Sequence, residues 1–206
     1  MPDTFATLDL PPSLAGDLWK LSPQERGRAR AMHRHREPEF NVVTAGHAAY
    51  LLRDRRDDGV RRISLRRGSL LFLYPEQDHV LAEPSRDFTL WIAVFTPELA
   101  QSAARTLPDG DTLAGAFAPA KVGAHFKEPE LRRLETLFGE VREEAAGAKT
   151  SPGGAAVFNA ALAYVLARAW MLYLRAADAP TTPVHPSVAD AAASSPVIRA
   201  TFRCPR

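Results

Sequence analysis

The sequence predicts a mainly β domain, a sandwich or a barrel, that is followed by a helical appendage. The first observation is a series of short runs between residues 39 and 96 that are rich in Val, Ile, Leu, Phe, Tyr and Trp. The second is that no helical pattern separates these runs, and the third is a change to helical periodicity from residue 97 onward. Closely spaced short strands without helices between them are typical of all-β folds.

Six segments are expected to form strands, and most are bounded by Gly, Pro or Asp: 39–46, 47–56, 60–68, 69–75, 79–84 and 87–95. The stretch RDDG (56–59) predicts a hairpin, because its Asp-Gly pair supplies the positive φ of a tight turn. Residues 1–38 show few clear elements.

Three later segments are expected to form helices. Thr96 is a predicted N-cap with Pro97 at the first helical position. Segment 128–146 places apolar residues on one face: Leu131, Leu134, Phe138, Val141 and Ala145. Segment 151–177 is apolar on most sides, with a repeating set formed by Phe158, Leu162, Val165, Ala169 and Tyr173. Such a helix needs burial either within its own chain or against its copy in a dimer, and both alternatives stay open.

The predicted organisation has three parts. Residues 1–100 form the β-barrel domain, with a core at about 19–96. Residues 101–177 form a helical region for dimerisation. Residues 178–206 are rich in Pro, Ala, Ser and Thr, and we expect a flexible tail.

Composition narrows the classes of function. The 206 residues carry a formal net charge of +2, which is too small to predict nucleic-acid binding. Cys204 is the single cysteine, so no internal disulfide is expected. The N-terminus lacks a secretory pattern, and the apolar run 160–174 contains Arg168 and is short for a membrane span. A cytoplasmic protein without a membrane is expected. Arginines of the predicted hairpin alternate with aspartates, which favours a solvated hairpin over a nucleic-acid stripe: Arg53, Arg55, Arg56, Arg61, Arg62, Arg66 and Arg67.

The stretch HRHREPE (33–39) combines two histidines and a glutamate. In a strand His33 and His35 point to the same side, and Glu39 shares their parity unless Pro38 breaks the alternation. Two imidazoles and a carboxylate suit a divalent transition metal, namely iron, manganese, nickel, zinc or copper. His79 follows another turn and is a candidate fourth ligand. Read alone, the same residues are also consistent with a solvated basic segment.

The spacing around these residues resembles two motifs of the cupin superfamily. The first motif is matched at each fixed position by Gly27, His33, His35, Glu39 and Gly46. The second is matched in part, because Gly68 and His79 are in place but Glu76 stands where glycine is usual and Glu83 where asparagine is usual. The resemblance implies a double-stranded β-helix barrel in which His33, His35, Glu39 and His79 bind one metal ion.

Residues 19–100 are most similar to the N-terminal cupin sensor domain of AraC-type transcription regulators. That resemblance implies a small-molecule ligand in the barrel and a homodimer through the C-terminal helices. The residues after VHPSV (184–188) leave no room for the two helix-turn-helix motifs of those regulators, so DNA binding is not expected without a partner.

Two functions stay open. The first is a metal-binding cupin module that binds a small molecule and dimerises. The second is a mononuclear cupin enzyme of the non-haem iron dioxygenase, isomerase or lyase type. In either case we expect Asn41, Phe72 and Tyr74 to face inward beside the metal and contact the ligand, whereas the catalytic residues stay unassigned.

Overall fold

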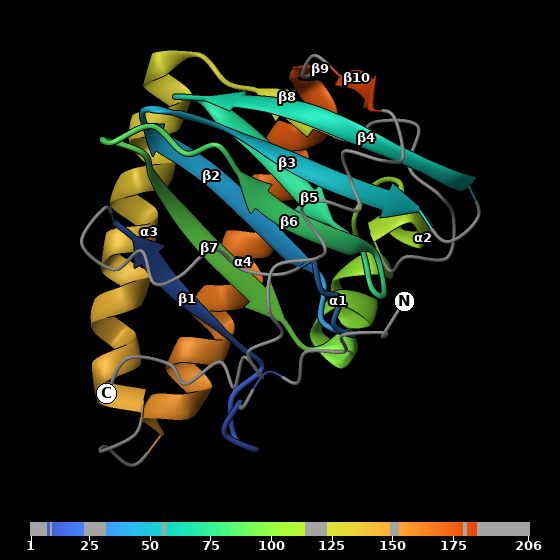
Figure 1. Ribbon diagram of the computed structural model, residues 1–206. Coiled ribbons are helices and arrows are strands. Elements are labelled where there is room, and N and C mark those ends of the chain that lie inside the picture. Colours follow the sequence, from blue (N-terminus) through green and yellow to red (C-terminus); the bar gives the residue numbers. More distant parts are fainter. Residues whose placement is uncertain are drawn as a thin grey trace.

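The computed structural model describes residues 8, 10–22, 32–54, 57–113, 123–148, 153–178 and 181–184. Seven strands come first, and they are followed by helices and three further short strands (Figure 1). The elements are β1 (Gly16–Leu21), β2 (Glu39–Ala45), β3 (His47–Asp54), β4 (Asp57–Arg66), β5 (Ser69–Leu73), β6 (Asp78–Ala82), β7 (Thr89–Phe95), α1 (Pro97–Ala104), α2 (Gly110–Leu113), β8 (Gly123–His125), α3 (Glu128–Ala148), α4 (Gly154–Arg175), β9 (Ala177–Asp178) and β10 (Thr181–Val184).

The strands form two antiparallel sheets. The six-stranded sheet has the order β1-β7-β2-β5-β8-β9, and the four-stranded sheet has the order β10-β4-β3-β6. A core of apolar side chains from both sheets fills the space between them, with Tyr50, Leu52 and Ile63 from one sheet and Leu71 and Ile92 from the other. The prediction of a mainly β domain with C-terminal helices is confirmed, and the arrangement is consistent with a cupin barrel with a helical appendage.

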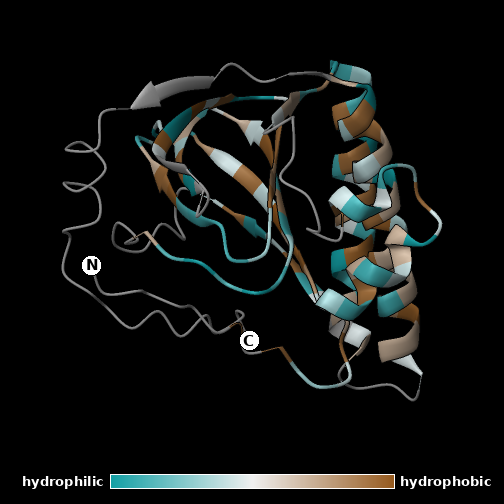
Figure 2. Ribbon diagram, turned by 90° about the vertical axis from the view of Figure 1, so that its right-hand side faces the viewer, coloured by the Kyte–Doolittle hydropathy of each residue, from teal (hydrophilic) through white to brown (hydrophobic). Residues whose placement is uncertain are grey.

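A second core lies on the outer face of the six-stranded sheet, where α3 and α4 pack (Figures 1 and 2). The apolar faces of these helices are as predicted: Leu131, Leu134, Phe138 and Val141 of α3 are buried, as are Phe158, Leu162, Val165, Ala169 and Tyr173 of α4. The Thr96 hydroxyl accepts a hydrogen bond from the Leu99 N–H at 3.3 Å, which confirms the predicted cap of α1.

Helix α4 meets its need for burial within this chain along one face. It is also the one helix of the described residues that is long and apolar enough to cross a membrane, judged by length and composition alone. Its apolarity has a simpler cause, because Phe158, Leu162, Trp170 and Tyr173 pack in the core beneath the sheet. Val157 and Tyr164 of α4 remain more than half exposed.

Four strands were missed in the sequence. β1 lies in the N-terminal region that shows few clear elements, and it pairs with β7 along its whole length. β8 and β9 extend the six-stranded sheet, while β10 pairs with β4. These three strands have two to four residues each, which is too short for a period of two to be read.

The predicted domain limits differ from the structure for the same reason. Segments on the C-terminal side of residue 100 complete both sheets, so the barrel does not end there. Residues 181–184 of the predicted tail form β10, and 185–206 lie outside the described residues. The hairpin between β3 and β4 exists, but Gly59 is a residue of β4, so the Asp-Gly pair is not its turn.

Candidate metal centre

His33 and His79 are brought together by a pair of backbone hydrogen bonds. The N–H of His33 donates to the carbonyl of His79 at 3.1 Å, and the N–H of His79 donates to the carbonyl of His33 at 2.8 Å. This is an isolated antiparallel bridge between the segment before β2 and the strand β6. Residues that face each other across such a bridge project to the same side, so both imidazoles point into the same space.

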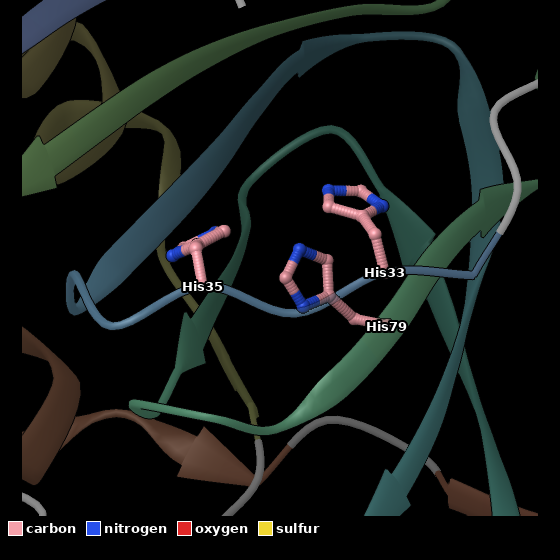
Figure 3. A group of neighbouring side chains, drawn as sticks. All are labelled: His33, His35 and His79. Carbon is pink, nitrogen blue, oxygen red and sulfur yellow. The ribbon is translucent and has the colours of Figure 1, made fainter. Parts of the chain in front are cut away.

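Three imidazoles converge at this point (Figure 3). One ring nitrogen from each of His33, His35 and His79 lies within 4.8 Å of the other two. The ring centroids of His33 and His79 are 4.4 Å apart, and those of His35 and His79 are 5.1 Å apart. His35 and His79 are almost fully buried, while His33 is buried less completely. The cluster therefore has an inner side within the barrel and a side nearer to solvent.

Backbone carbonyls orient two of the rings. The Nδ1 of His35 lies 2.8 Å from the carbonyl oxygen of Glu37, and the Nδ1 of His79 lies 2.8 Å from the carbonyl oxygen of Gln77. Because a carbonyl only accepts, each Nδ1 carries the proton and donates it. The Nε2 atoms are then the ones presented to the cluster, which is the arrangement that metal-binding histidines show in proteins.

Glu39 adjoins the cluster through His35. Its Oε2 lies 3.1 Å from the Nε2 of His35, and its Oε1 accepts a hydrogen bond from the Asn41 amide at 2.8 Å. The predicted alternation therefore survives Pro38, because the carboxylate faces the side on which His35 lies. Asn41 is fully buried on the next inward position of β2 and fixes the second carboxylate oxygen.

Burial and neighbouring charges set the ionisation of the site. Burial disfavours the charged carboxylate of Glu39, but the hydrogen bond and positive charge of His35 outweigh this and lower its pKa to about 2. Burial, then the positive charge of His33, lowers the pKa of His79 to about 3. Burial also opposes charging of His35, yet the hydrogen bond and charge of Glu39 prevail and raise its pKa. At neutral pH the site thus holds an ionised carboxylate beside a neutral His79.

The donor set fits a first-row transition metal. Neutral imidazoles and an ionised carboxylate are ligands of iron, manganese, nickel, zinc and copper. Donors at adjacent positions of an octahedral ion with bonds of about 2.1 Å are roughly 3.0 Å apart. His35 Nε2 and Glu39 Oε2 have about this separation, at 3.1 Å. An ion would replace the proton that those two atoms otherwise share.

The predicted ligand-contacting residues lie on two different faces. Asn41 faces the barrel interior, as expected. Phe72 and Tyr74 belong to the core between the sheet and the helices, so their expected place beside the histidines is corrected. The register explains this, because Asn41 pairs with Leu71 and only odd-numbered positions of β5 share its face. Contact of either aromatic residue with a ligand is untested.

The departures from the second cupin motif fall on unusual backbone. Glu76 has φ 62° and Glu83 has φ 52°, in the left-handed region that glycine and asparagine adopt more easily than glutamate. The usual residues of the motif match that backbone, and this chain keeps the turn shape with a residue less suited to it.

Three residues near the site were not singled out in the sequence. Glu37 and Gln77 act through their backbone carbonyls. Because each residue type has such a carbonyl, the sequence does not reveal this role. The Tyr50 ring lies 6.2 Å from that of His79. Its position follows from the register of β3 with β6, in which Leu52 faces His79 and Tyr50 lies two residues away on the same side.

The sequence matches no family model and no curated protein. Among solved structures, the fold is similar to apo ToxT from Vibrio cholerae, with 5% identity, coverage of 73% of this chain and 53% of that one, and a TM-score of 0.43. It is also similar to a mutant of Bacillus subtilis oxalate decarboxylase, with 14% identity, coverage of 51% and 34%, and a TM-score of 0.32. A vicilin from Solanum melongena gives 16%, coverage of 38% and 20%, and a TM-score of 0.31. The chain thus spans between a fifth and about half of the length of these proteins.

Proposed function

We propose that this chain is a metal-binding cupin module that holds one divalent transition metal with His33, His35, Glu39 and His79. The ion would present a small-molecule ligand to the barrel, as in a ligand-sensing and dimerisation domain of the AraC type. Asn41 would hold the Glu39 carboxylate in place. Sensing is the proposed role, and the metal is the anchor of the ligand.

The orientation of the imidazoles carries this proposal. Two buried histidines donate their Nδ1 protons to carbonyls at 2.8 Å and direct Nε2 toward a third histidine and a carboxylate. Histidines that only fill a core would each hydrogen-bond to their own neighbours, and their ring nitrogens would not have to point toward a common place. The cluster also unites residues from the segment before β2 and from β6, which the backbone bridge between His33 and His79 aligns.

A catalytic role is the second candidate, and the number of donors favours it. Four protein donors leave two positions open on a six-coordinate ion, where a substrate would bind. A bound ion of this kind supplies Lewis-acid or redox chemistry, as in cupin dioxygenases, isomerases and lyases. The residues of this chain would bind the ion, and the aliphatic side chains between the sheets would keep water from its inner side.

Metal analysis tests the site. Elemental analysis of the purified protein is expected to give close to one transition-metal ion per chain, and both His33→Ala and Glu39→Ala are expected to lose it. His47→Ala is the matched control, because His47 is an exposed histidine of β3 outside the cluster and its loss should leave the metal content unchanged. Absence of metal after reconstitution with each of the five candidate ions would contradict the proposal.

The proposed homodimer needs a separate measurement. Helix α4 exposes Val157 and Tyr164, which are seven residues apart and lie on one side of the helix. Light scattering is expected to report the mass of two chains, and a monomeric mass at all concentrations would refute the dimer. Two further observations would contradict the proposal: specific DNA binding by this chain without a partner, and a location outside the cytoplasm.

A further inference from the structure

The turn between β5 and β6 touches the metal centre at two points. It comprises Tyr74, Pro75, Glu76 and Gln77, and the N–H of Gln77 donates to the carbonyl of Tyr74 at 3.1 Å. The Gln77 side chain closes the turn a second time, because its Oε1 accepts from the N–H of Tyr74 at 3.3 Å. Proline at the second position and a positive φ at the third are typical of a type II turn.

Both contacts fix metal-site histidines. The N–H of Glu76 donates to the carbonyl of His35 at 2.8 Å. The carbonyl of Gln77 accepts from the Nδ1 of His79 at 2.8 Å. A rotation or shift of this turn would therefore move the segment that carries His35 and release the ring of His79 at the same time.

The other end of the turn is anchored in the helical layer. The Tyr74 side chain is buried, and its ring lies 5.1 Å from that of Phe72. The Phe72 ring in turn lies 5.3 Å from Trp170 and 6.0 Å from Tyr173, both in α4. Tyr74 belongs to the same apolar core as Trp170 and Tyr173, and burial, then the neighbouring Tyr173 phenol, raises the pKa of Tyr74.

The backbone of the turn is held under strain. Glu76 has φ 62°, in the left-handed region that a residue with a Cβ atom adopts only at a cost in energy. Its surroundings must therefore hold it there, and they include the His35 carbonyl on one side and the buried Tyr74 side chain on the other. A strained element held from two sides responds when either side changes.

We propose that the turn Tyr74–Gln77 couples metal occupancy at the histidine cluster to the packing of α4 against the sheet. Tyr74 is a positioning residue that acts on His35 and His79 through the turn. The inference rests on the proposed metal site and specifies how that site is regulated. Metal binding would stabilise the turn and the packing of α4. Because the coupling is reciprocal, a change that favours the loosened state of α4 would lower the affinity for the metal.

Affinity for Co²⁺, followed by its visible absorption, tests the coupling from the side of the helix. Tyr173→Leu removes the phenol beside Tyr74 without altering the turn or a metal donor, and it is expected to weaken Co²⁺ binding about five- to tenfold. Tyr74→Leu, which alters the turn's own contact with the helical layer, should weaken Co²⁺ binding by a similar factor. Arg175→Leu is the matched control, because it changes an exposed residue of the same helix two positions from Tyr173 and should leave the affinity unchanged. Circular dichroism checks that the variants are folded.

Hydrogen exchange of the wild type gives the reciprocal readout without any substitution. Co²⁺ is expected to slow exchange of the α4 amides near Trp170 and Tyr173 about five- to tenfold, and to leave those at the start of α4 unchanged. Unaltered affinity in Tyr173→Leu together with unaltered exchange in α4 would overturn the coupling and leave the metal site standing. Failure of the wild type to bind Co²⁺ would overturn both.

Discussion

Both faces of the six-stranded sheet are buried, but one packs against the helices and the other carries the candidate metal centre. The outer faces of β2 and β5 carry Phe40 and Phe72, which pack against the helices. The inner faces carry Glu39, Asn41 and Leu71 and meet the other sheet. All five residues of β5 are buried, so hydrophobicity does not reveal which parity faces the barrel. The register with β2 shows which residues of β5 face the barrel. A functional residue on a strand that is buried on both sides therefore has to be identified from the residues that it pairs with on the neighbouring strand.

The largest effect is expected on the outer face. Phe72→Ala removes a ring that lies within 6.3 Å of the rings of Phe40, Tyr74 and Trp170. The cavity and lost burial should lower the free energy of unfolding by about 3–5 kcal/mol. Chemical denaturation measures this loss. A loss below about 1 kcal/mol would mean that the helices do not pack on this face as described.

A smaller effect on stability, and a larger one on the metal, is expected on the inner face. Asn41→Leu removes the amide that holds Glu39, but it also removes a buried acceptor, Asn41 Oδ1, that has no hydrogen-bond partner among the described residues. The two changes oppose each other, so the loss of stability should stay at about 1–2 kcal/mol. Affinity for Co²⁺ should fall about tenfold.

The contrast with Phe72→Leu sharpens this prediction. That variant keeps an apolar residue on the outer face and should retain more of the metal affinity than Asn41→Leu does. If Phe72→Leu weakens Co²⁺ binding more strongly than Asn41→Leu, the metal does not bind at the inner face of the sheet.

A gain in stability is expected at the turn that joins the two faces. Glu76→Gly relieves the positive φ at this position, and the free energy of unfolding should rise by about 1 kcal/mol. Asp109→Gly, at φ 50°, should also gain, whereas Ser64→Gly within β4 should lose stability. A loss in Glu76→Gly would show that the glutamate side chain, rather than the backbone, holds the turn.

The smallest effect is expected at the surface, where Arg67 links the sheet to α3. Its guanidinium contacts the Thr44 carbonyl and both carboxylate oxygens of Glu128, at 3.1 and 2.7 Å. Arg67→Ala should lower the melting temperature slightly, and about 1 M salt should remove much of the difference.

The pH dependence of this small loss has a definite sign. The hydrogen bond from Arg67 lowers the pKa of Glu128 from its usual 4.5. The stabilisation is therefore present above pH 4.5 and is lost as the pH falls below it. Melting curves of wild type and Arg67→Ala should differ at pH 7 and approach each other at pH 3. A difference that grows in acid would contradict the pairing.

The sequence allowed the helical layer to be predicted better than the short strands. The faces of α3 and α4 repeat every three or four residues over about twenty positions, and this repetition identifies their buried sides. The strands β8, β9 and β10 are too short to repeat, and they are held by partners far away in the chain. Conversely, the placement of Phe72 and Tyr74 failed because a strand buried on both sides has no polar face to orient it.

The candidate site was predicted from the spacing of its residues along the sequence, which resembles the cupin motifs, and not from the geometry of the fold. His33, His35 and His79 are brought together in one cluster, with the His33–His79 bridge as the physical cause, and Glu39 lies beside it at 3.1 Å from the Nε2 of His35. The carbonyls of Glu37 and Gln77 and the strain at Glu76 could not be predicted, because they depend on backbone geometry that residue type does not encode. Coordination by the four residues stays a prediction until metal is measured.

The order of the strands along the chain has a consequence for folding. β4 and β5 each acquire a partner, β10 and β8, that is synthesised only after α1. Until then both strands present unpaired N–H and C=O groups at an open edge, which is where chains adhere to one another. Pairings of such long sequence separation also close slowly. A nascent chain released before α4 would therefore be prone to aggregate, and completion of the barrel should be among the last events of folding.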